Sequence, residues 1–392
     1  MKRLMKIVFI FSTILFLNQG LFSQPINGIW TSVKELTDKP KSGPAWQVLF
    51  EGAQQKTLRP NLADQNDHTG VFVLAKAIVY VKTGNEKYKS EALQTIQRLV
   101  AIGMPGGRTL AWGRNIAAYV MAADLLGYRT SEFESYIHHV ADVWRCAQIE
   151  VCGGGRKATL REMFEKRPSN WGSHAFASLA AIYRYLGKMD ELQAIHDYWV
   201  RSVDITKPRP ECHDRDYGKK LSKGWANWQT PDGKRDPRWI LPQNAKHKKC
   251  GINLDGIIPD DMDRGAPFAC HIDEKHFHFT KYVWEGLQGL IVAARILDRA
   301  GLSIWEVGDK AIYRAAYAAQ VRLGFLNNEW KATSKNVGWL LVFLDDVYGT
   351  DWLSSLTNPK IKWGYGRGAG WGYVLNGISK KDRKSPALVT KQ

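Results

Sequence analysis

The sequence predicts an all-α protein with one large helical domain, and three observations lead to that prediction. Apolar residues recur at three-to-four-residue spacing along eight segments, as in amphipathic or buried helices. Glycine-containing turns separate several of these segments, and no run of alternating apolar and polar residues is long enough for a β domain. Repeated helix–turn–helix units stack as antiparallel hairpins, so in a single domain of this size they can close into an α/α toroid.

Each helix is expected from its own apolar periodicity. The segments, in chain order, are 71–82, 88–102, 115–126, 132–144, 174–186, 191–200, 282–300 and 310–323. Turns at Gly84, Gly127, Gly187 and Gly301 follow four of them, and glycine at such a position is typical of a helix end.

Other parts of the chain break this pattern. Residues 1–23 have the basic start, short apolar run and small residue of a cleavable signal peptide, so we expect a periplasmic or secreted protein. The domain is expected to span 24–375. Within it, residues 207–275 are rich in Pro, Gly, Asp, Lys and Trp, which predicts an irregular insertion over one mouth of the toroid. Residues 376–392 form a basic tail.

The composition favours an anionic sugar polymer as the partner. The formal net charge is +17, and a positive field attracts anionic ligands. Export argues against nucleic acid, and the lack of a basic amphipathic tail argues against a membrane. The sixteen tryptophans offer aromatic faces for sugar rings. We expect a monomer that binds an acidic polysaccharide.

Five cysteines in an oxidising compartment permit one or two disulfides and leave at least one thiol over. Cys146 with Cys152, and Cys212 with Cys250 or Cys270, are candidate pairs, and the sequence leaves the pairing open. The spacing does not match a zinc site, and we expect neither a metal nor another cofactor.

The stretch Ser-Asn-Trp-Gly-Ser-His (169–174) runs into the helix predicted from 174, and it holds the first candidate site. Asn170 and His174 are four residues apart, so a helix would present them on one side. Trp171, between them, is a candidate substrate-binding residue. The alternative is structural: Asn170 caps the helix, and His174 is a buried core histidine.

Two further clusters contain arginine. Arg114 and Asn115 open the helix predicted from 116, where a guanidinium can clamp a carboxylate, although a plain surface arginine has the same pattern. Arg264 lies between Asp263 and Gly265 in the insertion, and it is either an exposed ligand-binding arginine or part of a solvated loop.

A last cluster precedes and begins the helix at 282–300. Tyr282, Glu285 and Gln288 follow each other at three-residue spacing and fall near one face of that helix. The basic residues just before them are His276, His278 and Lys281. A polar face on an otherwise apolar helix predicts a lined cleft. The alternative is that Tyr282 is a boundary tyrosine and Glu285 pairs with a neighbouring base.

Three motifs together resemble the alginate-lyase-like polysaccharide lyases with an α/α-toroid fold. They are Gly-Arg-Asn-Ile-Ala-Ala-Tyr-Val-Met-Ala-Ala-Asp-Leu-Leu-Gly-Tyr (113–128), Asn-Trp-Gly-Ser-His (170–174) and Tyr-Val-Trp-Glu-Gly-Leu-Gln-Gly-Leu (282–290). The resemblance covers roughly residues 65–350. It implies catalytic roles for Asn170, His174 and Tyr282, with a basic residue that holds the substrate carboxylate. Arg264 is the candidate for that residue, but it lies farther upstream than in the family pattern, so His276, His278 or Lys281 can replace it.

The implied reaction is β-elimination in a 4-linked uronic-acid polymer such as mannuronate-rich alginate or glucuronan. Loss of the C5 proton builds negative charge on the carboxylate, which Asn170 and a cation would stabilise. Tyr282, with its pKa lowered by the positive field, would take the proton and protonate the leaving oxygen. Where proton and leaving group lie on opposite faces, as in guluronate, His174 would be the base. The substrate, the direction of attack and endo or exo action stay open.

Two other functions remain as alternatives. A glycoside hydrolase needs two carboxylates facing one bond, for which Asp260, Asp261 and Glu285 are candidates. A binding protein for acidic glycans would use charge and tryptophan stacking without turnover. Only elimination produces an unsaturated uronate, so product absorbance separates the three.

Overall fold

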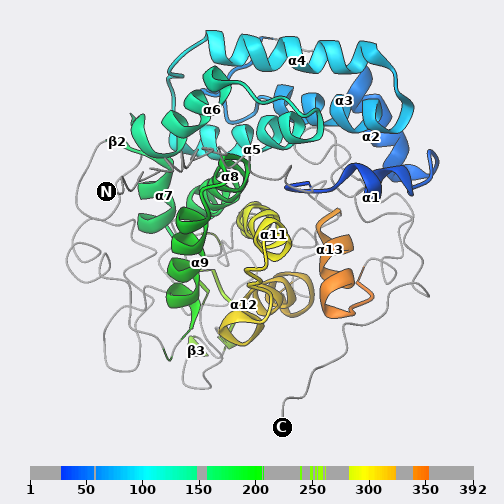
Figure 1. Ribbon diagram of the computed structural model, residues 1–392. Coiled ribbons are helices and arrows are strands. Elements are labelled where there is room, and N and C mark those ends of the chain that lie inside the picture. Colours follow the sequence, from blue (N-terminus) through cyan, green and yellow to red (C-terminus); the bar gives the residue numbers. More distant parts are fainter. Residues whose placement is uncertain are drawn as a thin grey trace, which may run out of the picture.

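A computed structural model describes residues 28–56, 59–147, 157–204, 206, 239–240, 248–249, 252–253, 255–258, 261, 282–323 and 339–352. Helices make up most of this part of the chain (Figure 1). Its strands form two short antiparallel pairs, β1 (Cys146–Ala147) with β2 (Lys157–Ala158) and β3 (Lys248–Lys249) with β4 (Ile252–Asn253). The all-α prediction is confirmed.

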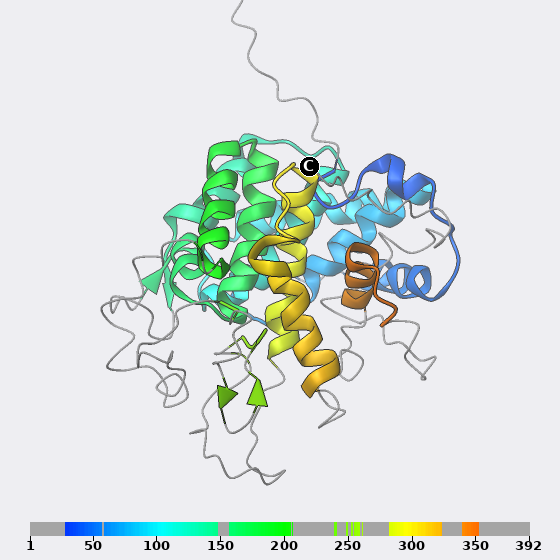
Figure 2. The ribbon, with the colours of Figure 1, turned by 90° about the horizontal axis from the view of Figure 1, so that it is seen from below.

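Four helices form an inner row that is buried along most of its length. They are α3 (Thr69–Thr83), α5 (Thr109–Leu125), α8 (Asn170–Leu186) and α11 (Val283–Arg299). Each packs against the next in that order, and α8 lies between α5 and α11 (Figures 1 and 2). Small and apolar residues on nearly all sides make such helices fit for the interior.

The other helices pack around this row or continue it. They are α1 (Val33–Thr37), α2 (Pro44–Gln54), α4 (Glu86–Ala101), α6 (Ser131–His138), α7 (Leu160–Lys166), α9 (Met189–Val203), α12 (Val307–Tyr317) and α13 (Trp339–Tyr348). Two of them run on as π-helical turns, α6 into η1 (His139–Val143) and α12 into η4 (Ala318–Leu323). The helices α4, α6 and α9 bury a single face.

Every segment with predicted helical periodicity contains a helix in the structure. Gly84 and Gly187 end α3 and α8 in the left-handed conformation, as their positions predicted. Four helices of the described residues were not predicted: α1, α2, α7 and α13. The first and third are only 5 and 7 residues long and begin with capping boxes, Ser32 with Glu35 and Thr159 with Glu162.

Residues 28–39, the N-terminal segment, are held against the last inner helix. Arg299 Nε of α11 donates to the Gly28 carbonyl at 2.8 Å, and Arg299 Nη1 pairs with Glu35 at 2.7 Å. The backbone N–H of Ile29 donates to Asp124 of α5 at 2.8 Å. Trp30 is buried against Phe343 of α13. The start of the described chain is thus joined to helices near its end.

Two buried lysines of α3 satisfy backbone carbonyls at the ends of the neighbouring helices. Lys82 Nζ donates to the carbonyls of Leu36, Thr37 and Lys39, at the end of α1. Lys76 Nζ donates to the Ala53 carbonyl of α2 at 2.6 Å and pairs with Glu91 of α4. A cation near a helix C-terminus also opposes the negative end of the helix dipole.

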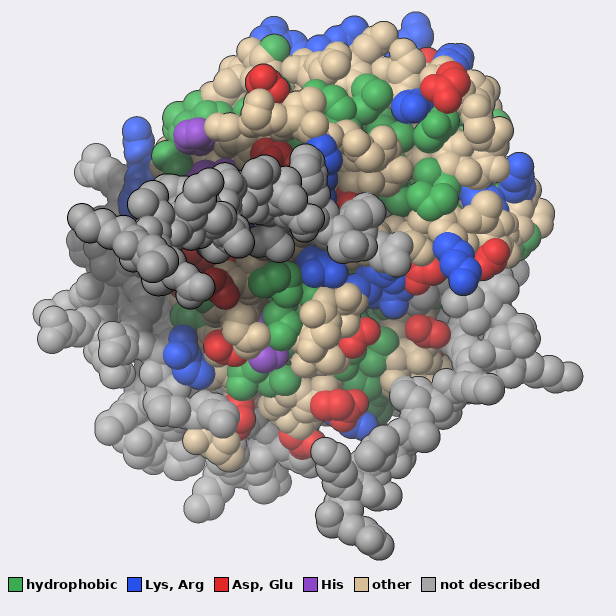
Figure 3. Space-filling view, viewed as in Figure 1, with side chains coloured by type: hydrophobic (Ala, Val, Ile, Leu, Met, Phe, Trp, Pro, Cys, Tyr) green, Lys and Arg blue, Asp and Glu red, His purple; other side chains and the backbone are tan. Residues whose placement is uncertain are grey.

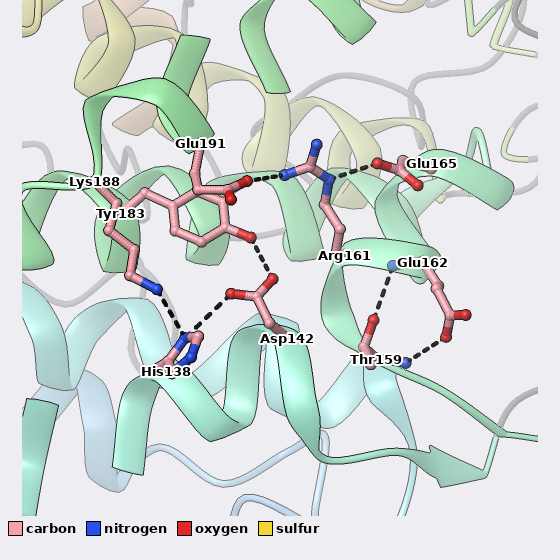
Figure 4. Close-up of polar contacts among 9 residues, drawn as sticks. All are labelled: His138, Asp142, Thr159, Arg161, Glu162, Glu165, Tyr183, Lys188 and Glu191. Carbon is pink, nitrogen blue, oxygen red and sulfur yellow. Dashed lines mark hydrogen bonds and ion pairs between the residues drawn. The ribbon is translucent and has the colours of Figure 1, made fainter. Parts of the chain in front are cut away.

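A polar network connects the outer half of α8 to α6, α7 and α9 (Figure 4). The buried hydroxyl of Tyr183 donates to Asp142 at 2.6 Å, and burial together with that carboxylate raises the pKa of Tyr183. The second oxygen of Asp142 lies 3.3 Å from His138 Nδ1. Arg161 of α7 pairs with Glu191 of α9 at 3.1 Å. The hydrogen bond and the ion pairs thus join α8 to the turn after α6, and α7 to α9.

Of the predicted insertion, short pieces are described: Trp239 packs against Phe164 of α7 and Trp199 of α9, and residues 255–261 pack against α11 and α12. Asp255 pairs with the buried Arg314 of α12, and Gly256 has a φ of +72° at a point where a Cβ atom would overlap the Arg314 carbonyl. The predicted signal peptide, the stretch 262–275 and the tail 376–392 lie outside the described residues. Within the described part, no helix is both long and apolar enough to cross a membrane.

Asp124 makes the stability of the fold depend on pH. Burial raises its pKa from 3.8 to about 6. The folded state therefore binds this proton more tightly than the unfolded state, so the contribution of Asp124 to stability is complete below about pH 4 and is lost as the pH rises to about 6.

We expect Asp124→Asn to remove this loss while it keeps an oxygen acceptor for Ile29. The variant should match wild type below pH 4 and exceed it by about 2 kcal/mol above pH 6, since one pKa unit is worth about 1.4 kcal/mol and partial exposure reduces the effect. Urea unfolding across that pH range measures the difference. A constant offset at all pH values would contradict the assignment.

Candidate functional site

The inner helices α5, α8 and α11 run in the same direction, which brings their N-terminal ends together. At one end, Arg114 of α5 pairs with Glu285 of α11 beside His174 of α8. At the other end, Asp124 of α5 lies in the field of Arg184 of α8 and Arg299 of α11. Side chains from three distant parts of the sequence therefore converge at the N-terminal ends.

Two glycines allow α5 and α11 to approach the same turn of α8. A Cβ atom at Gly289 would lie 2.3 Å from the carbonyl carbon of Ser173, and one at Gly113 would lie 2.9 Å from the nitrogen of Ala175. The Ser178 hydroxyl of α8 adds a hydrogen bond of 2.7 Å to the Gly113 carbonyl. Both neighbouring backbones thus reach α8 at the position of His174.

At this closest approach, one carboxylate contacts two basic side chains. Arg114 Nη2 lies 2.8 Å from Glu285 Oε2, and His174 Nε2 lies 3.6 Å from the same oxygen. The side chains of Arg114 and His174 are 4% and 5% exposed, whereas Glu285 is 22% exposed. The carboxylate is therefore the most open member of this cluster, which we call the Arg–Glu–His cluster.

The structure corrects the expected position of Arg114. The sequence placed it at the entrance of a helix that begins at 116, but α5 begins at Thr109, so Arg114 lies in the second turn. It is buried, so the interpretation as a plain surface arginine is wrong. The interpretation that Glu285 pairs with a neighbouring base is confirmed, and the base is Arg114.

Asn170 is the first residue of α8 and is 1% exposed. The helix is capped by Ser169, whose side chain accepts a hydrogen bond from the N–H of Trp171. The interpretation of Asn170 as the cap is therefore wrong. Asn170 and His174 lie one turn apart on α8, at the end that faces the cluster.

Asn115 and Trp171 are both buried in supporting positions. Asn115 Nδ2 donates to the carbonyl of Asp64 at 2.8 Å, which ties α5 to the loop before α3. Trp171 is 2% exposed, and the Arg167 guanidinium lies 5.4 Å from its ring centre. Both side chains are positioned to shape the site from behind rather than to lie on its surface.

Tyr282 is the N-cap residue of α11 and is 41% exposed. Its carbonyl accepts a hydrogen bond of 2.8 Å from the N–H of Gly286, so its backbone belongs to the first turn. Tyr282 therefore offers an exposed phenol three residues before Glu285, on the same helix. The other predicted site residues, Arg264, His276, His278 and Lys281, lie outside the described residues.

The site favours a negatively charged ligand group. The N-terminal end of a helix carries a partial positive charge, and three such ends meet here. Asn170 adds an amide, and Arg114 and His174 add basic groups, while Glu285 balances part of the charge. Burial of Arg114 and His174 strengthens their electrostatic effect, because water screens them little.

A second carboxylate, that of Asp261, is buried against α11 next to Glu285. Asp261 is fully buried, and its Oδ2 atom would lie 2.3 Å from a Cβ atom at Gly286. It therefore packs against the backbone of α11, on the side of Gly286. Asp261 and Glu285 do not form two open carboxylates in this structure.

The residues that sequence reasoning missed are the glycines. Gly113 and Gly289 lie inside helices, where glycine costs about 1 kcal/mol relative to alanine. A glycine kept inside a helix despite that cost is a sequence signal of close packing, and both motifs contain it. Cys146 has a free, buried thiol whose pKa is raised by burial to about 12, so the candidate pair of Cys146 with Cys152 is wrong; the other four cysteines lie outside the described residues.

Comparison of the sequence with protein-family models and with curated proteins gives no match.

Gly289→Ala tests the close approach of α8 and α11. The new methyl group would overlap the backbone at Ser173, so the helices must separate, and we expect a loss of about 3 kcal/mol in the free energy of unfolding. Gly106→Ala is the control, because a Cβ atom there meets no atom within 4 Å. Equal stability of the two variants in urea unfolding would contradict this packing.

Proposed function

We propose that the protein is a polysaccharide lyase that cleaves a 4-linked uronic-acid polymer by β-elimination. The observation that carries the proposal is the Arg–Glu–His cluster at the start of α8 and α11, with Asn170 one turn before His174 and an exposed Tyr282 three residues before Glu285. The alternation of inner and outer helices supports the further proposal of an α/α toroid.

The reaction requires stabilisation of a doubly charged intermediate at the substrate carboxylate. Preorganised donors lower the barrier when they face the charge that develops. Asn170 and His174 offer such donors from one side of α8, and the helix ends add a positive field. In the proposed scheme these two residues neutralise the carboxylate, and Arg264 or a basic residue from 276–281 completes the set.

Glu285 has a positioning role in this scheme. Its carboxylate holds the Arg114 guanidinium at 2.8 Å and lies beside the His174 ring, so it fixes both side chains relative to α8. Arg114 is thereby engaged by a protein carboxylate rather than open toward solvent. We therefore assign Arg114 to the support of Glu285 and His174 and leave contact with the substrate carboxylate to the other basic residues.

Tyr282 is the proposed base and acid. In a mannuronate polymer the C5 proton and the C4 oxygen lie on the same side, so one phenol can remove the proton and protonate the leaving oxygen. Its exposure at the start of α11 gives a polymer access to it. With guluronate the two lie on opposite faces, and His174 would act as the base. Mannuronate-rich alginate and glucuronan are the proposed substrates.

The two alternatives have weaker support. A hydrolase would need two open carboxylates; of the three candidates, Glu285 is engaged by Arg114, Asp261 is buried, and Asp260 lies outside the described residues. A glycan-binding protein without activity would not need a buried imidazole beside a carboxylate. We also propose an exported, monomeric protein, in line with the basic and apolar start of the sequence.

The direct test is ultraviolet absorbance of the unsaturated uronate while the purified protein acts on polymannuronate, polyguluronate, glucuronan, hyaluronan and chondroitin. We expect a rise with polymannuronate or glucuronan. New reducing ends without absorbance would instead indicate hydrolysis. Binding without either signal would indicate a glycan-binding protein.

Tyr282→Phe should lower kcat by at least about 1,000-fold and leave polymer binding unchanged, because only the proton-transferring hydroxyl is lost. Tyr317→Phe is a matched control, since Tyr317 is also 41% exposed. Activity is measured by absorbance and binding by calorimetry. Wild-type turnover of the Tyr282 variant would exclude it as the base.

Glu285→Gln should lower kcat/KM about 10- to 100-fold, because a neutral amide orients Arg114 and His174 less firmly. Glu134→Gln, which alters an exposed pair with Arg129, is the control and should keep full activity. Because Glu285→Gln leaves the buried Arg114 guanidinium without its carboxylate, it should unfold at a lower urea concentration than Glu134→Gln, so activity is compared where both variants are folded. Unchanged activity of Glu285→Gln would refute its positioning role.

A further inference from the structure

A second basic feature lies outside the cluster, at the C-terminal end of α4. Arg59 and Arg98 line a cleft of about 410 Å³ together with Ala101 and Ile102. Both arginines are exposed, and Ala101 and Ile102 give the cleft an apolar part. Figure 3 shows Lys and Arg side chains along the upper edge of the molecule, over α4.

These two arginines differ from most others in the described part of the chain. Arg114, Arg161, Arg299 and Arg314 each have a carboxylate within ion-pair distance. Neither arginine of the cleft has such a carboxylate among the described residues. Arg98, in the last turn of α4, also complements the helix dipole, but Arg59 lies in a loop and has no such structural role.

The loop that begins with Arg59 connects the cleft to the candidate site. Asp64, in the same loop, accepts the hydrogen bond from Asn115, the neighbour of Arg114. Five residues of chain span at most about 18 Å, so Arg59 lies within that distance of Asp64. The loop also contacts the turn before α5, since Ala63 lies against Gly107. Arg59 therefore lies within about 18 Å of the residue that contacts Asn115, the sequence neighbour of Arg114.

We propose that the cleft is a second subsite, which binds the carboxylate of a uronic-acid residue several units away from the bond that is cleaved. This inference rests on the proposed lyase function. A uronate residue combines an anionic group with an apolar ring face, and the cleft offers guanidinium groups beside apolar side chains. Guanidinium groups bind carboxylates in a bidentate geometry, which adds direction to the charge attraction.

The subsite is tested with the double variant Arg59→Gln/Arg98→Gln in the full-length protein. Loss of two exposed charge contacts should raise KM for long polymannuronate or glucuronan about tenfold, with kcat unchanged. Turnover of short oligosaccharides, which cannot reach the cleft, should stay at the wild-type value. The control is Arg201→Gln, because Arg201 is an exposed arginine in the last turn of α9.

Gel retardation by the same polymers supplies a readout that does not require turnover. If the protein cleaves none of these polymers, the lyase function fails. Loss of retardation in the double variant alone would then still show that the cleft binds the polymer. If the protein is an active lyase and the double variant behaves as wild type, the subsite is refuted. The subsite is also refuted if Arg201→Gln loses as much polymer binding as the double variant. It is likewise refuted if the double variant loses binding to anionic vesicles and duplex DNA to the same extent, because both results would show general charge attraction.

Discussion

The contact of α8 with its two inner neighbours is the constraint on which the site depends. Helix axes usually lie 8–10 Å apart, at a distance set by the side chains between them. At Gly113 and Gly289 no side chain intervenes, so both neighbours meet the backbone of α8 directly. Arg114 follows Gly113, and Glu285 lies about one helical turn before Gly289. The close approach therefore brings Arg114, His174 and Glu285 within ion-pair distance although they are far apart in the sequence.

The parallel direction of the inner helices gives the two ends of the row opposite characters. At the N-terminal ends, the helix dipoles and the basic side chains of Arg114 and His174 give a positive field. At the C-terminal ends, Arg184 and Arg299 offset the negative dipole, and residues 28–39 cover Asp124 and Arg299. Among the described residues, the N-terminal segment covers the C-terminal ends of α5 and α11, and the proposed site lies at the opposite ends. The opposite dipole charge at the two ends of the row follows from the shared direction of the inner helices.

Sequence reasoning located the helices well, because periodicity and terminal glycines are local signals. It failed for α1 and α7, which are too short for a period, for α2 and α13, and for the start of α5, where Thr109 to Asn115 mixes apolar, polar and charged residues. It paired Asn170 with His174 correctly, since both lie on one helix. It did not foresee that Arg114 engages Glu285, because that contact joins residues 171 positions apart and is decided by packing.

The attachment of residues 28–39 to α11 has a consequence for folding. Arg299 contacts Gly28 and Glu35 across separations of 271 and 264 residues. Contacts of such high order form late, because a long loop must close first. During synthesis the N-terminal segment can first contact α3 and α5, through Lys82 and Asp124, whereas its contacts with Arg299 must wait until α11 has been made.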